Sequence, residues 1–182
     1  MKKVKRKLLH QRNIKLNGFL REDNLFDLEA ELLDTKNYNV SNYDRGEILA
    51  GEPIHKMKIV LTIDNKMFIK KATAETLFSP FNICKKANNS FKMLEGLQIK
   101  PGWKKKINEL IGNVKGCTHI REMLGSLATT AFQTIQGHNN KTSKESGGNK
   151  APNEKPRLLG SCYAFKTNTE VVKRIWPDWY QN

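Results

Sequence analysis

The chain has 182 residues, of which 38% are hydrophobic, and its formal net charge is +14. This length and apolar content suit one folded domain with its own core. The chain has no apolar run near the roughly twenty residues of a membrane span, and the basic residues 1–9 are not followed by a secretory h-region, so we expect a cytoplasmic protein with no membrane partner. Three cysteines, an odd number, argue against a disulfide scaffold.

Two β-hairpins are predicted in the first half of the chain. In residues 12–35, apolar residues alternate with polar ones on both sides of a short polar turn, at Ile14, Leu16, Leu20, Phe26, Leu28, Ala30 and Leu32. The polar stretch 38–51 is expected to be a loop. A second hairpin is predicted over 53–74, with a two-residue turn at Asp64-Asn65. His55 would then lie at the entry of its first strand, near a sheet edge.

Three helices are predicted after the hairpins. The first runs from Asn82 to Gly96, and the second begins near Trp103 and stops at Gly112. The third begins at Thr118, a residue type favoured at N-caps, and closes at Gly137. This order of elements predicts an α+β fold, in which an antiparallel sheet of two hairpins is covered on one face by helices.

Composition divides the chain into three segments. We expect residues 1–137 to form the α+β core domain. Residues 138–156 are rich in Asn, Gly, Ser and Lys, which predicts a flexible linker. Residues 157–182 regain apolar character and are expected to pack back on the core.

The candidate functional residues are cysteines and histidines at element boundaries. Cys84 and Cys117 both open predicted helices, and the imidazole of His55 would lie beside them if these helices cover one face of the sheet. Zinc, copper and iron–sulfur clusters prefer such soft or borderline ligands. A fourth ligand would be His119, Cys162 or water. We therefore predict a centre holding zinc or an iron–sulfur cluster; the alternative is that each cysteine is a small buried apolar residue.

Two other functions are consistent with the sequence. Cys117 could be the nucleophile of a transferase, because a helix N-terminus stabilises a thiolate, with His119 or His55 as its partner and Asp34 or Asp44 as a third group. The chain could also be an interaction module, whose lysine-rich surface binds an acidic protein or nucleic acid. We favour nucleic acid least, because the basic stretches carry no interleaved aromatic residues.

Several short blocks resemble a bacterial domain family of unknown function. Its members share R-x-D-G-l-x-D-i-E-a, P-I-H-x-M and G-C-T-H-L blocks and a C-terminal Cys-Ala-type segment. The matching residues here are 19–30, 33–36, 53–57, 81–84, 116–119 and 162–164. Asn24 stands where the family pattern has Gly, in a predicted turn. The resemblance implies no particular activity.

The order of the elements is also similar, more distantly, to that of iron–sulfur scaffold proteins. In this comparison His55 takes the position of an Asp, and Cys84 and Cys117 match the second and third ligands, whereas the first cysteine has no counterpart. The resemblance implies an accessory role in sulfur or metal handling or in the maturation of an enzyme. The implied partner is another protein, either that enzyme or a metal or sulfur donor.

Overall fold

The computed structural model describes residues 4–145 and 155–182, and the side chains of residues 4–139 and 155–182. The chain divides into two compact units, Met1–Asn139 and Asn140–Asn182. Within the described ranges, the structure contains no helix that combines the length and apolar character needed to cross a membrane.

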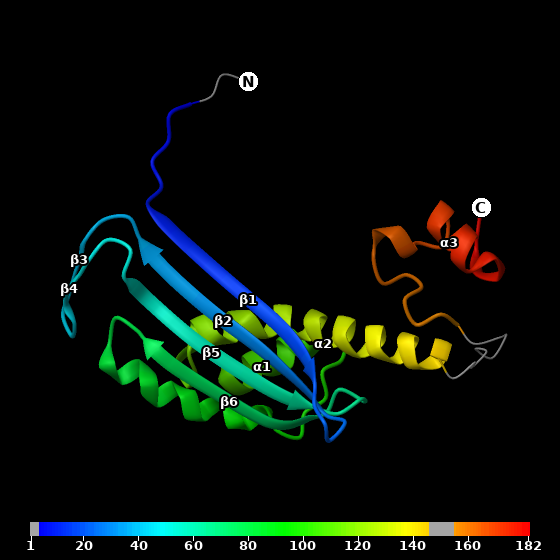
Figure 1. Cartoon of the computed structure of the whole chain (residues 1–182), viewed down its shortest axis with the longest axis horizontal. Coiled ribbons are helices and arrows are strands. Elements are labelled where there is room, and N and C mark those ends of the chain that lie inside the picture. Colours follow the sequence, from blue (N-terminus) through cyan, green and yellow to red (C-terminus); the bar gives the residue numbers. More distant parts are fainter. Residues whose placement is uncertain (1–3, 146–154) are drawn as a thin grey trace. The chain divides into compact units, whose positions relative to one another are not determined.

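The first unit is built on a four-stranded antiparallel sheet, which confirms the predicted α+β class (Figure 1). The strand order is β1-β2-β5-β6, so the two hairpins join through β2 and β5. His55 therefore lies on a central strand and not at a sheet edge, because β5 pairs with β2 as well as with β6. The strands are β1 (His10–Leu20), β2 (Phe26–Lys36), β5 (Pro53–Ile63) and β6 (Ile69–Phe78).

The conformations of two turns between strands follow from the residues in them. Asn24 has a φ of 61°, the left-handed region in which Gly and Asn are the favoured residues, so it can replace the glycine of the family pattern. The turn after β5 is longer than predicted: the Asp64 carboxylate accepts hydrogen bonds from the backbone N–H groups of Lys66 and Phe68, both at 2.9 Å. The expected loop 38–51 contains a small hairpin of β3 (Val40–Asn42) and β4 (Gly46–Ile48).

One face of the sheet is covered by helices (Figure 1). They are the 3₁₀ helix η1 (Asn82–Leu94), α1 (Trp103–Ile111), the short η2 (Asn113–Lys115) and α2 (Thr118–Glu145). Every second residue of β2 is buried against them. The five apolar residues of α2 that recur at helical spacing and so predict its buried side are all buried as well; the two sets are Phe26, Leu28, Ala30, Leu32, Ile120, Leu124, Leu127, Ala131 and Ile135. The indole Nε1–H of Trp103 donates to the backbone oxygen of Leu124 at 3.1 Å and so joins α1 to α2.

Helix α2 does not end at Gly137, as the sequence predicted, but continues to Glu145. A glycine inside a helix costs only about 1 kcal/mol relative to alanine, too little to stop a helix that is otherwise well packed. The first part of the predicted linker, 138–145, is therefore helical, and its part 146–154 lies outside the described residues.

The second unit contains η3 (Tyr163–Phe165), α3 (Glu170–Ile175) and η4 (Pro177–Trp179). Thr169 is the N-cap of α3 and accepts a hydrogen bond from the backbone N–H of Val172. The ring of Phe165 lies 5.0 Å from that of Trp176, centroid to centroid. The packing of residues 157–182 on the core stays a prediction.

Candidate metal centre

A row of polar residues crosses the sheet on the face that the helices cover. In the strand register, Asp34 of β2 pairs with Arg12 of β1 on one side and with His55 of β5 on the other. Asp34 continues the alternation that buries Phe26 to Leu32, and only 1% of its surface is exposed. A carboxylate at a core position is strongly destabilising unless its oxygens have partners.

Arg12 provides the main partner of this carboxylate. Its Nε and Nη2 atoms donate to the two oxygens of Asp34 at 2.7 and 2.8 Å, a bidentate ion pair. Its remaining Nη1 donates to Glu122 of α2 at 2.7 Å, so this one guanidinium connects the sheet with the helix above it. Burial raises the pKa of Asp34, but the hydrogen bond and charge of Arg12 outweigh it, and the pKa of this carboxyl lies below its ordinary value.

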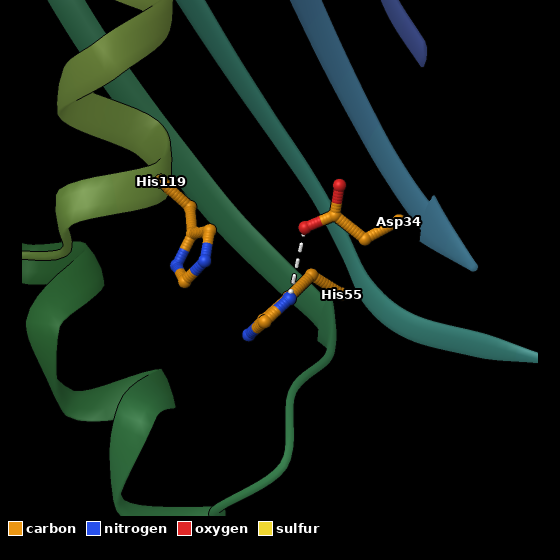
Figure 2. A group of neighbouring side chains, drawn as sticks. All are labelled: Asp34, His55 and His119. Carbon is orange, nitrogen blue, oxygen red and sulfur yellow. Dashed lines mark hydrogen bonds and ion pairs between the residues drawn. The ribbon is translucent and has the colours of Figure 1, made fainter. Parts of the chain in front are cut away.

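The ionised Asp34 also determines how His55 is oriented. His55 Nδ1 lies 3.0 Å from Asp34 Oδ2 (Figure 2). Because an ionised carboxylate can only accept hydrogen bonds, the proton must be on Nδ1, and Nε2 keeps its lone pair. Carboxylate–histidine pairs of this kind are common around metal ions, where the carboxylate orients the ligating ring.

His119 completes the group from the first turn of α2. Its ring lies beside that of His55, with the centroids 3.8 Å apart and the planes inclined by 31° (Figure 2). Burial lowers the pKa of both histidines, assisted at His55 by the neighbouring His119 and at His119 by the charge of Arg12. Both rings are therefore neutral near pH 7, the form that binds metal ions.

One ligand atom from each of Asp34, His55 and His119 lies within 4.8 Å of the others. In residues 4–145 and 155–182, this is the one group of three or more His, Cys, Asp or Glu residues with such proximity. A single ion could bridge these atoms after small side-chain movements, since zinc–nitrogen and zinc–oxygen bonds are about 2.0–2.2 Å long.

The five predicted ligands are thus only partly brought together. His55 and His119 belong to the group, and the Cys117 sulfur lies next to it, 4.0 Å from His119 Nδ1. Cys84 lies half-buried in the first turn of η1, and Cys162 is exposed in the second unit; neither belongs to the group. The sequence indicated Asp34 only as one candidate for the third group beside Cys117 and a histidine, and not as a metal ligand.

The comparisons with known proteins place the chain in a family. Residues 10–133 match a family model described as a protein of unknown function (DUF2889). The chain belongs to this family. The matched residues contain Arg12 and all three members of the group. Neither the curated proteins nor the solved structures include a match to this chain, so the predicted likeness to iron–sulfur scaffold proteins has no support from a known structure.

The substitution Asp34→Asn tests whether the buried carboxylate stabilises the fold. It keeps the size of the side chain but leaves Arg12 without its main counter-charge. We expect a loss of about 3 kcal/mol in the free energy of unfolding, the lower end for breaking a buried ion pair, because Arg12 is 31% exposed and keeps Glu122. Urea denaturation measures this loss.

Asp23→Asn is the matched control. Asp23 also receives a bidentate ion pair, from Arg21, but at an exposed site, so its replacement should change stability far less. Equal small effects of the two substitutions would show that Asp34 does not have the stabilising role described here.

The two buried histidines predict how stability depends on pH. Their pKa values lie below the ordinary 6.5 in the folded chain, so between the folded and unfolded pKa values the unfolded chain binds more protons. The stability that the two neutral histidines contribute is fully present above their pKa in the unfolded chain. It is lost as the pH falls through their lower pKa in the folded chain. The free energy of unfolding of the metal-free protein, measured by urea denaturation, should therefore decrease as the pH falls from about 7.5 to 5.5.

The variant His55→Gln/His119→Gln should lose less stability than the unmodified protein over the same pH interval. An unchanged pH dependence in the double variant would contradict this assignment.

Proposed function

We propose that this protein binds a transition-metal ion through His55 and His119, supported by Asp34, and acts as an accessory protein in metal handling. The observation that supports it best is the convergence of two neutral imidazoles and an ionised carboxylate from β2, β5 and α2. These residues come from separate elements, so their proximity is a product of the fold and not of the local sequence.

The contacts of Asp34 indicate that its main role is to orient His55, and that it contributes less to direct coordination of the ion than the two histidines do. Both of its oxygens already accept hydrogen bonds, from Arg12 and from His55. His55 Nε2 and the ring of His119 would then provide the bonds to the ion, and solvent would complete its coordination. Asp34 and Glu122 carry two negative charges against the one positive charge of Arg12, a local balance that favours a cation.

The ligand types favour a single ion over a cluster. Imidazole and carboxylate suit Zn²⁺, Fe²⁺, Co²⁺, Ni²⁺ or Cu²⁺, whereas an iron–sulfur cluster is held mainly by several thiolates. No cysteine belongs to the group found in the described residues. We therefore favour zinc or a related ion over the iron–sulfur cluster, which was the other cofactor predicted from the sequence.

Titration of tag-free, metal-free protein with Zn²⁺ or Co²⁺, followed by calorimetry, tests the proposal. We expect one ion to bind per chain. His55→Ala and His119→Ala should each abolish stoichiometric binding, because each removes a proposed direct ligand, and His138→Ala, the control, should leave it unchanged. If the unmodified protein binds neither ion, or if the three variants bind alike, the proposed metal site is wrong.

A second candidate function, nucleic-acid binding, is favoured by the distribution of charge. Residues 82–121, which contain the helices η1, α1 and η2, have nine Lys and Arg residues but two acidic ones, whereas residues 10–78 have ten basic and eleven acidic residues. The eight lysines of the helical segment are all exposed: Lys85, Lys86, Lys92, Lys100, Lys104, Lys105, Lys106 and Lys115. A polyanion that contacts these lysines would release its condensed counterions.

Salt dependence tests this second function. Binding of duplex DNA, measured by fluorescence anisotropy, should weaken steeply with salt, and the variant Lys104→Gln/Lys105→Gln/Lys106→Gln should reduce the slope of log K against log salt by about 2 to 3. The control Lys56→Gln/Lys66→Gln/Lys71→Gln removes the same charge from the strands and from the turn between β5 and β6. Equal effects of the two triple variants would contradict a binding surface on the helices.

A further inference from the structure

Two sulfur atoms lie beside the imidazole pair, and the site described so far does not use them. The Cys117 sulfur is 3.7 Å from the Met57 sulfur and 4.0 Å from His119 Nδ1. Met57 is 1% exposed, and Cys117 is half-buried. The described structure therefore places a thiol, a thioether and two imidazoles in one region.

The fold explains why these four side chains meet. His55 and Met57 are two residues apart on β5, so both point to the face of the sheet that the helices cover. Cys117 and His119 are two residues apart where α2 begins, directly over that end of β5. Each element thus contributes one imidazole and one sulfur.

We propose that the ion bound at this site is copper, taken up as Cu(I) by His55, His119 and Cys117, with Met57 as a weaker fourth ligand. This inference rests on the proposed metal-binding function and names its metal. Thiolate and thioether sulfur suit Cu(I) and zinc, and the combination of two histidines, one cysteine and a weakly bound methionine is a known copper site.

Two of the distances are close to those of such a centre, whereas Cys117 lies outside the group of atoms within 4.8 Å of one another and must move toward His55 when the ion binds. Around a tetrahedral ion with bonds of about 2.0–2.3 Å, neighbouring ligand atoms are roughly 3.3–3.8 Å apart. The sulfur–sulfur distance of 3.7 Å lies in this interval, and the 4.0 Å between Cys117 and His119 needs only a small rotation of either side chain.

The charge of the complex also favours Cu(I). On binding, the Cys117 thiol releases its proton to solvent and the sulfur forms a bond to the ion, with no change in oxidation state. One thiolate and one Cu(I) give a centre with no net charge. Its burial beside Met57 costs less than that of the net positive centre that a divalent ion would form with the same ligands.

The alternative is that the two sulfurs only pack together, since Cys117 also contacts the apolar core. Anaerobic titration of reduced, tag-free protein with Cu(I), in competition with a coloured Cu(I) chelator, separates the two. We expect one Cu(I) per chain. Cys117→Ser should weaken its affinity by more than about 100-fold, above the range for partners outside the coordination sphere, and Met57→Leu by about tenfold.

Three controls make the result specific. Cys84→Ser should keep the unmodified affinity, because Cys84 lies in the first turn of η1 and is not one of the four proposed ligands. Cys117→Ser and Met57→Leu should both still bind Co²⁺ through the histidines, which shows that they are folded; Met57→Leu also conserves the core volume. A Cu–thiolate absorption band should appear in the unmodified protein and be absent in Cys117→Ser.

The two proposals fail in different ways. If the unmodified protein binds Zn²⁺ or Co²⁺ but holds Cu(I) no more tightly than Cys117→Ser does, the copper assignment is wrong and the metal site stands. If it binds none of the three ions, both proposals are wrong.

Discussion

The buried carboxylate of Asp34 is the constraint on which this site depends. It occupies a position that the strand pattern assigns to the core, and it stays ionised there because Arg12 and His55 hydrogen-bond to it. Removal of a charge from water is strongly unfavourable, so the surrounding structure must supply this whole set of partners at once. The orientation of His55 then follows from the charge of its neighbour.

Arg12 links this constraint to the rest of the fold. Its contacts extend from β2 to Glu122 of α2, so the same side chain that neutralises the carboxylate also connects the helix carrying His119 to the sheet. The two histidines of the group are therefore held by an ionic network at the rim of an otherwise apolar core. Such supporting contacts keep ligands close to the geometry of binding, which lowers the cost of reorganisation when an ion enters.

The family match includes this entire network, since residues 10–133 contain its members from Arg12 to Glu122. The two proposed functions use different parts of the molecule. The proposed metal centre lies between the sheet and the start of α2, whereas the basic residues are exposed on the helical segment 82–121. A protein that handles metal ions can have both features, because they use separate residues.

Much of the secondary structure followed from local patterns. Alternation of apolar residues predicted β1, β2 and β5, and helical spacing predicted the buried side of α2. The structure differs from the sequence-based prediction at the end of α2 and in the type of helix η1, two features that local sequence does not determine. Helix α2 passes Gly137 because the packing of its buried residues between Ile120 and Ile135 outweighs the weak helix propensity of one glycine. The segment η1 is a 3₁₀ helix although its apolar residues have ordinary helical spacing.

For the site, the sequence by itself identified two residues of the group, His55 and His119, as well as Cys117 beside them. It also contained the signal for Asp34, a charged residue at a position that alternation assigns to the core, although it indicated Asp34 only as one candidate third group beside Cys117 and a histidine. The tertiary structure alone decided which of these residues meet. The reason is that strand register and helix placement are set by packing of the whole core, so Arg12, Asp34 and His55 align only when β1, β2 and β5 pair.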